Sequence, residues 1–270
     1  MQRRKTIFKN IVNIFFAVSA LTLVISAFML AVTAIKDYRN IKYWERLSKR
    51  KENAPIFTRD DILPEYQDLY DENSDIIGWL TIDGARIDYP VMQTKDDPEY
   101  YLRRNFSGED DNGGTPFADY RCDILPVRSF NIIIYGHYTS GDRLFRRLLE
   151  YSYQSYYHKH KFFQFDTLNE HGEYEVVAAF YADAGDFELI GEWEPDLEQA
   201  YEFCNYIEVD SREGFEKFVR NIEERKLYET DSVCTIDSHI LTLICCAPKE
   251  FSGIEENGRF VLIAKQVKSK

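Results

Sequence analysis

The chain of 270 residues contains little cysteine, and its few cysteines follow no regular spacing. They are Cys122, Cys204, Cys234, Cys245 and Cys246. An odd number without the spacing typical of small secreted domains does not predict a disulfide framework, and no CxxC pair suggests zinc. A vicinal disulfide between Cys245 and Cys246 stays open, although such a bond needs an unusual geometry.

Other metal ligands are equally sparse. His158-Lys159-His160 offers two imidazoles, but no further ligand cluster accompanies them in the sequence. We therefore interpret this stretch as a solvated polar segment, and we expect neither a metal nor an organic cofactor.

Basic residues are scarce beyond the first 51 positions. Residues 1–51 hold 11 Lys and Arg against 2 Asp and Glu, so residues 52–270 hold 22 against 44 and carry a net charge of −22. A domain this acidic repels nucleic acid and anionic lipid surfaces, so a nucleic-acid partner is not expected. The sequence shows no internal repeat and no low-complexity tract.

One long segment lacks charge altogether. Residues 11–35 are 25 successive uncharged positions, more than the ~20 that a helix needs to cross a membrane. We predict a transmembrane signal-anchor helix here, with the basic residues 1–10 on the cytoplasmic side. A cleaved signal peptide is the alternative because residues 31–34 (AVTA) resemble a cleavage site, but its apolar core would be shorter. We expect residues 36–75, basic as far as position 51, to form a linker and N-terminal helices that lead into one domain at 76–270.

Within that domain, short β-rich runs bounded by turn residues dominate the pattern. Many short strands at modest spacing predict a mostly antiparallel β-barrel or sandwich with peripheral helices. The runs are residues 78–84, 87–93, 131–137, 174–183, 239–247 and 259–267.

Two helical segments interrupt the β-rich pattern. Residues 141–163 place Leu144, Leu148 and Tyr151 at helical spacing. Residues 210–224 carry apolar residues at i, i+3, i+4 and i+7, and Asp210 with Glu213 resembles a capping box. We expect this apolar stripe to pack against the sheet rather than to take part in chemistry.

Three reactive side chains stand at the end or the start of a β-run. His137 follows a run that ends at Gly136, Cys246 ends a second run, and Arg259 begins the last one. A neighbouring cation stabilises a thiolate, histidine can protonate a leaving amine, and arginine can hold an oxyanion, so the trio suits acyl transfer. Taken singly, each has a structural interpretation: a buried thiol, a histidine in a turn, and a surface salt-bridge partner.

At these residues the sequence resembles the sortases, cysteine transpeptidases that attach proteins to Gram-positive cell walls. The family signature combines a T-L-x-T-C strand, a histidine in a GH pair after an apolar strand, and an arginine on the following strand. Here these are residues 242–246 (TLICC), residues 135–137 (YGH) and Arg259. The similarity extends over residues 70–267 and includes the stretch GWLTIDGARIDYPVMQ.

The N-terminal helices, the helix at 210–224 and the lack of an apolar C-terminal span resemble class B of this family. The resemblance implies a closed antiparallel or mixed β-barrel with catalytic roles for His137, Cys246 and Arg259, and no cofactor. Its implied partners are secreted surface proteins with a C-terminal sorting motif, cleaved after threonine, and an amine of a peptidoglycan precursor that accepts the acyl group. It also implies a single-pass enzyme whose catalytic domain, residues 76–270, lies on the extracellular face of the membrane.

The resemblance also bears on the choice between the adjacent cysteines. Side chains alternate along a strand, so Cys245 shares a face with Leu241 and Leu243, and Cys246 lies on the other face. The family register selects Cys246 as the nucleophile and leaves Cys245, at the second threonine position of the signature, in the core. Ile244, where class B members often have serine, is a further departure.

Two other functions stay open at this point. One is a membrane-anchored cysteine protease that only hydrolyses its thioacyl intermediate. The other is a catalytically silent surface domain that binds a partner, in which Cys246 would be unreactive toward an alkylating probe.

Overall fold

The computed structural model describes residues 15, 19–23, 25–32, 59–125, 127–139, 144–183, 204, 206–255 and 257–269. The chain divides into two units, Met1–Pro55 and Ile56–Lys270. In the first unit the described residues are helical, and large apolar side chains such as Phe28 and Leu30 are exposed. No helix among these described residues is both long enough and apolar enough to span a membrane. Residues 1–10, and all of 36–58, for which a cytoplasmic N-terminus and a linker were predicted, lie outside the described residues.

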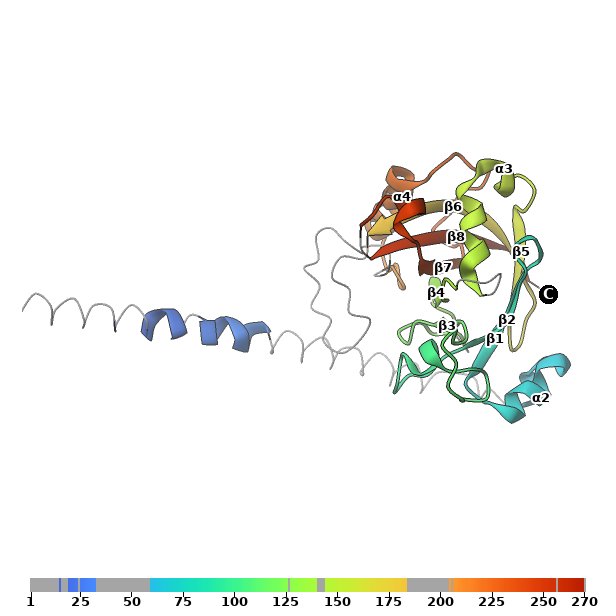
Figure 1. Ribbon diagram of the computed structural model, residues 1–270, viewed down its shortest axis with the longest axis horizontal. Helices are drawn as coiled ribbons and strands as arrows, with labels where there is room; N and C mark the ends of the chain where they lie inside the picture. Colours follow the sequence, from blue (N-terminus) through green and yellow to red (C-terminus); the bar gives the residue numbers. More distant parts are fainter. Residues whose placement is uncertain are drawn as a thin grey trace, which may run out of the picture. The chain divides into compact units, whose positions relative to one another are not determined.

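The second unit is built on a closed β-barrel of eight strands, which confirms the predicted barrel (Figure 1). The order around the barrel is β1-β2-β3-β4-β7-β8-β6-β5, and β5 pairs with β1 to close it. The β2–β3 and β4–β7 pairs are parallel, and the other six are antiparallel. The strands are β1 (Ile76–Ile82), β2 (Ile87–Met92), β3 (Phe117–Ala118), β4 (Asn131–Tyr135), β5 (Phe162–Thr167), β6 (Gly172–Asp183), β7 (Ile240–Cys246) and β8 (Gly258–Ser269).

All six predicted β-runs are strands, and two further strands were missed. β3 is only two residues long, too short to leave a pattern in the sequence. The first two residues of β5, Phe162 and Phe163, were wrongly included at the end of the helical segment 141–163, and the rest of the strand was not predicted. Its buried and exposed positions alternate, as expected for a strand with one face toward the core.

Short helices surround the barrel. The predicted segment 141–163 holds two of them, η4 (Phe145–Ser152), a 3-10 helix, and the single turn α3 (Gln154–Tyr157). The others among the described residues are η1 (Arg59–Asp61), α2 (Pro64–Glu72), η2 (Asp83–Ala85), η3 (Tyr100–Arg103), α4 (Arg212–Arg225) and α5 (Lys249–Ser252).

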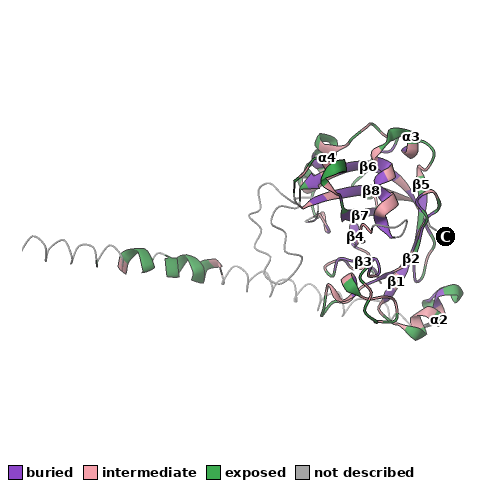
Figure 2. Cartoon of the chain, in the orientation of Figure 1, coloured by how far each residue is buried: buried purple, intermediate pink, exposed green. Residues whose placement is uncertain are grey.

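Helix α4 corrects one detail of the sequence analysis. Its N-cap is Ser211, whose side-chain oxygen accepts a hydrogen bond from the Gly214 N–H at 3.1 Å, so Asp210 is not the capping residue. The predicted apolar stripe does pack on the core: Phe218 and Ile222 are buried. Figure 2 shows the outer side of α4 exposed beside buried barrel strands.

Strands β4 and β7 lie in the core of the barrel. β4 and β7 are buried along nearly their whole length, so both read as continuous apolar runs rather than alternating ones. Cys246, the last residue of β7, is the first exposed position of that strand.

Candidate active site

Strand pairing brings the three predicted site residues to one end of the barrel. In the parallel β4–β7 pair, Tyr135 lies opposite Ile244, and the Gly136 N–H continues the ladder by donating to the Ile244 carbonyl at 3.0 Å. His137 and Cys246 each stand two residues beyond the Tyr135–Ile244 pair. In the antiparallel β7–β8 pair, Cys246 lies directly opposite Arg259. Residues paired in this way present their side chains on the same face of the sheet.

Cys246 is the accessible thiol of the protein. All five cysteines are free, and Cys246 is exposed while the other four are buried. Burial raises the pKa of the Cys122 and Cys234 thiols to about 12 and also raises the pKa of Cys204. A thiol with so high a pKa has almost no thiolate at neutral pH, and a substrate does not reach it.

Its neighbour Cys245 lies in the core, as predicted. The side chain is 2% exposed, and its sulfur donates a weak hydrogen bond to the Phe145 carbonyl at 3.7 Å. Burial first, and then the adjacent Cys246, raise the pKa of the Cys245 thiol well above its usual value, against a smaller opposing effect of Arg259. Adjacent positions in a regular strand face opposite ways, and here one of them reaches solvent and the other does not.

His137 is half-buried and held by one ring nitrogen. Its Nε2 lies 2.8 Å from the Leu102 carbonyl. A carbonyl only accepts, so in this contact Nε2 carries the proton and Nδ1 of the neutral ring is unprotonated. Nδ1 has no partner within the described part of the chain, so it is available to take a proton and, once protonated, to give it up.

Arg259 is also half-buried, and its Nη1 donates to the Gly258 carbonyl at 3.1 Å. Of the acidic residues that the structure describes, none forms an ion pair with it. The alternative interpretation as a surface salt-bridge partner therefore finds no support in the described residues. Its guanidinium retains donors for an anionic or carbonyl oxygen near Cys246.

Phe145, which the sequence analysis did not single out, contacts the residues next to both His137 and Cys246. Its N–H donates to the His137 carbonyl at 3.1 Å, and its own carbonyl accepts from the Cys245 thiol. Its fully buried ring packs against Gly136 so closely that a Cβ there would lie 2.6 Å from the ring. The first residue of η4 thus fixes β4 relative to β7 just before the two reactive side chains.

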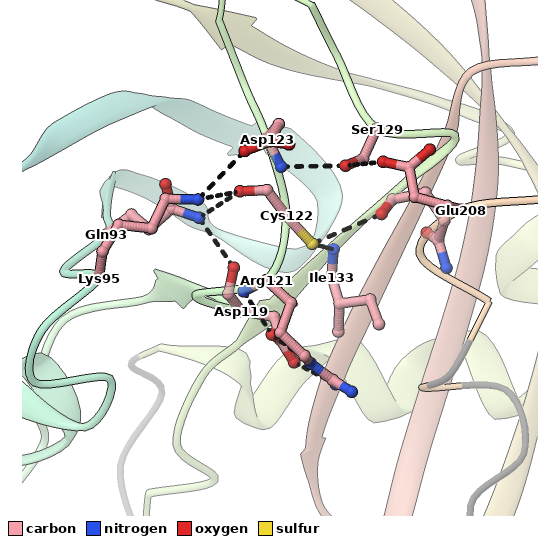
Figure 3. A network of polar contacts seen from close by, with 10 residues as sticks. Gln93, Lys95, Asp119, Arg121, Cys122, Asp123, Ser129, Ile133 and Glu208 are labelled. Carbon is pink, nitrogen blue, oxygen red and sulfur yellow. Dashed lines mark hydrogen bonds and ion pairs between the residues drawn. The ribbon is translucent and has the colours of Figure 1, made fainter. Parts of the chain in front are cut away.

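A polar network with buried members such as Asp119 and Cys122 also contacts β4 (Figure 3). The Asp119 carboxylate accepts from Arg121 Nη2 at 2.7 Å, from Arg121 Nε at 2.9 Å and from the Tyr135 hydroxyl at 2.9 Å. Burial alone would raise the pKa of Asp119, but these donors and the Arg121 charge hold it below the usual 3.8. Tyr135 is two residues before His137, so this ion pair anchors the strand that presents the histidine.

The same network continues away from the site. Gln93 Nε2 donates to the carbonyls of Asp119 and Cys122 at 2.8 and 2.9 Å, and Cys122 accepts a hydrogen bond from the Ile133 N–H at 3.4 Å. Cys122 therefore acts as a structural residue under β4. Among the described residues, no group of three or more His, Cys, Asp or Glu side chains is arranged to hold a metal ion.

Comparison with known proteins agrees with the barrel fold. No protein-family model matches the sequence. The chain is 27% identical over 250 residues to sortase B of Staphylococcus aureus, covering 91% of this chain and 92% of the relative. It is 29% identical over 220 residues to sortase B of Listeria monocytogenes, covering 80% of each.

Solved structures give the same result. A Bacillus anthracis protein described as similar to sortase B is 30% identical, with a TM-score of 0.64, and the match covers 86% of this chain and 98% of that one. A substrate complex of Staphylococcus aureus sortase B matches at 25% identity with a TM-score of 0.63, over 86% and 94% of the two chains.

The eight-stranded barrel and the matches to sortase B over most of the chain identify a cysteine transpeptidase of the sortase type. Within that type, the chain belongs to the class B sortases.

Proposed function

We propose that Cys246 is the nucleophile of this transpeptidase, with His137 as its acid and base and Arg259 as the group that holds the substrate oxygen. The observation that carries the proposal is the register of β4, β7 and β8, which presents these three residues at one barrel end. The accessibility of Cys246, against four buried cysteines, supports the choice of thiol.

The first half-reaction consumes a sorting peptide. His137 Nδ1 first takes the proton of the Cys246 thiol. The resulting thiolate attacks the carbonyl carbon of a threonine, and Arg259 stabilises the oxyanion of the tetrahedral intermediate. The C–N bond then breaks, His137 gives a proton to the departing amine, and a thioacyl-enzyme remains. The secreted protein that carries the motif supplies the acyl group.

The second half-reaction consumes an amine, which we propose is that of a peptidoglycan precursor. A bound ammonium loses one proton to solvent, and the resulting amine attacks the thioester carbonyl. As the new C–N bond forms, the second proton passes to His137, and the electron pair of the breaking C–S bond leaves with the Cys246 sulfur.

The test compares alanine variants of the two adjacent cysteines. Peptides varied around a Pro-x-Thr core are incubated with enzyme, and the thioacyl-enzyme is captured for mass spectrometry. Cys246→Ala should abolish cleavage and capture, whereas Cys245→Ala should retain most activity because it removes only a small buried side chain. The reverse result would exclude Cys246. If product analysis gave only hydrolysis even at high amine concentration, the protein would be a protease instead.

We also propose that residues 11–35 anchor the enzyme to the membrane, with residues 1–10 inside and the domain at 76–270 outside. The supporting observation is 25 uncharged positions in a row, of which the described ones are helical. Expression in a Gram-positive host should place the full chain in the membrane fraction, and deleting residues 1–51 should release it. Recovery of the intact chain in the soluble fraction would refute the anchor.

A further inference from the structure

A cavity of about 210 Å³ opens at the end of the barrel where His137 lies. Strand pairing places residues that line the cavity at the same barrel end as His137. Met92 of β2 pairs in parallel with Phe117 of β3, and Phe117 pairs antiparallel with Tyr135 of β4. The positions two residues before Met92 and before Phe117 therefore lie at the same barrel end as the position two residues after Tyr135, which is His137.

The cavity is on the side of His137 away from Arg259. Around this barrel end the order is β2, β3, His137 after β4, Cys246 on β7, and Arg259 on β8. The cavity belongs to β2 and to the loops beside it. Its lining includes Tyr89, Pro90, Phe106, Asp111, Thr115 and Leu144.

The wall of the cavity and the support of His137 share one piece of backbone. Gly114 lines the cavity with φ of +60° and packs so tightly that a Cβ would lie 2.4 Å from the Leu102 carbonyl oxygen. That oxygen is the one His137 Nε2 contacts. Leu144, which also lines the cavity, bridges to Tyr138, the residue after His137. A ligand in this cavity is therefore next to the elements that hold the imidazole.

The lining combines apolar walls with one carboxylate. Asp111 accepts a hydrogen bond from the Gly113 N–H at 2.8 Å through Oδ1, and no basic side chain among the described residues pairs with it. Proline, phenylalanine and leucine side chains form much of the remaining lining. A carboxylate in such a hollow matches a primary ammonium on a slim chain, because the walls contact the chain and the carboxylate offsets the charge. The net charge of −22 over residues 52–270 attracts the same cation.

We propose that this cavity binds the acceptor amine of the transpeptidation, with Asp111 holding its ammonium group before attack. The inference rests on the proposed function, which requires a second substrate to approach the thioester. That substrate must lose a proton to His137 as it attacks, so it has to arrive beside the imidazole. Arg259 on β8 lies on the other side of Cys246 from His137. The cavity on the His137 side therefore offers the amine a position from which it can approach the thioester.

The experiment measures the two half-reactions separately. The acceptor probes are triglycine and the side-chain amine of Nα-acetyl-lysinamide, and hydroxylamine serves as a small neutral nucleophile that does not need the cavity. Asp111→Asn keeps the oxygen that caps the Gly113 N–H but removes the charge. Asp110→Asn, an exposed neighbour outside the cavity, is the matched control. The full chain is used throughout.

We expect Asp111→Asn to raise the KM for at least one amine probe about tenfold, the effect of losing roughly one charge-assisted hydrogen bond. Its rate of thioacyl-enzyme formation from the sorting peptide and its reaction with hydroxylamine should match the unaltered chain, which also shows that the variant is folded. Asp110→Asn should change none of these quantities.

Two results would overturn the inference while leaving the proposed function intact. One is an unchanged KM for both amines in Asp111→Asn. The other is an equal loss in thioacylation by the peptide, which would assign the cavity to the departing part of the sorting peptide. Absence of any thioacyl-enzyme in the unaltered chain would instead refute the proposed function, and the role of the cavity with it.

Discussion

Replacing Gly136 with alanine has two opposing effects on the free energy of unfolding: alanine restricts the unfolded chain, and its Cβ clashes with Phe145 in the folded one. Gly136 does not have φ in the left-handed region, so alanine can adopt its backbone conformation. In open space Gly136→Ala would therefore stabilise the fold by about 0.4–1 kcal/mol, because alanine restricts the unfolded chain. In this structure the added Cβ would lie 2.6 Å from the Cγ and Cδ2 atoms of Phe145. Carbon atoms in good contact are about 3.5–4.0 Å apart, so something must move by about 1 Å.

Little freedom exists for that movement. The Phe145 ring is fully buried, and the backbone of Phe145 is tied to the His137 carbonyl and the Cys245 thiol. We therefore expect Gly136→Ala to lower the free energy of unfolding by roughly 1–3 kcal/mol, the usual range for overpacking. Because the shift occurs beside His137, kcat/KM for transpeptidation should fall about 100-fold.

Urea unfolding and steady-state kinetics on the same preparations test both numbers. The control is Gly136→Ala combined with Phe145→Leu, which removes part of the ring that the Cβ meets. The double variant should lose less stability than the two single variants predict by addition, by about 1 kcal/mol or more. Additive effects, or a stabilised and fully active Gly136→Ala enzyme, would refute the proposed steric conflict.

Two further predictions concern the thiols and the ion pair under β4. At neutral pH, iodoacetamide should label the folded protein once, at Cys246, and should reach five sites only after unfolding in urea; fast labelling of a second cysteine would contradict the burial and raised pKa of the others. Asp119→Asn should lower the free energy of unfolding by about 2–4 kcal/mol, because it leaves the Arg121 charge without its buried partner. Since the folded state lowers the pKa of Asp119, its contribution is complete above pH 3.8 and is lost as the pH falls through the lower folded value. The unaltered protein should thus lose stability in acid more steeply than Asp119→Asn, and parallel urea midpoints from neutral pH down to pH 2 would argue against this role.

The sequence predicted those features of the fold that depend on a single strand or on one face of a helix. The continuous apolar runs of β4 and β7 predict buried strands. These strands end at Tyr135 and Cys246, so the two reactive side chains lie at the strand ends. The apolar stripe of α4 likewise predicts its packing, although local hydrogen bonding moved the cap by one residue to Ser211.

The parts that depend on pairing between distant strands were not predictable in this way. No local pattern indicates that β4 and β7 run parallel with Tyr135 opposite Ile244, yet that register is what brings His137 beside Cys246. The role of Phe145 depends on the distance between its ring and a missing Cβ, which no spacing along the chain encodes. Asp119 and Tyr135 are 16 positions apart, with no local pattern linking them, and their hydrogen bond accompanies the β3–β4 pairing.

The distinction between a transpeptidase and a protease depends on features outside the trio. The proposed trio of Cys246, His137 and Arg259 would form a thioacyl-enzyme in either case, and a histidine base activates water as readily as it accepts a proton from an amine. Water is always present, so transfer dominates only if an amine is held beside the thioester before attack, where its effective concentration is high. The cavity that contains Asp111 is therefore the part of the structure on which the choice of nucleophile depends. A variant that binds the amine more weakly in this cavity should lose a larger fraction of its thioacyl-enzyme to hydrolysis at a fixed amine concentration. The rate at which the thioacyl-enzyme forms should stay the same.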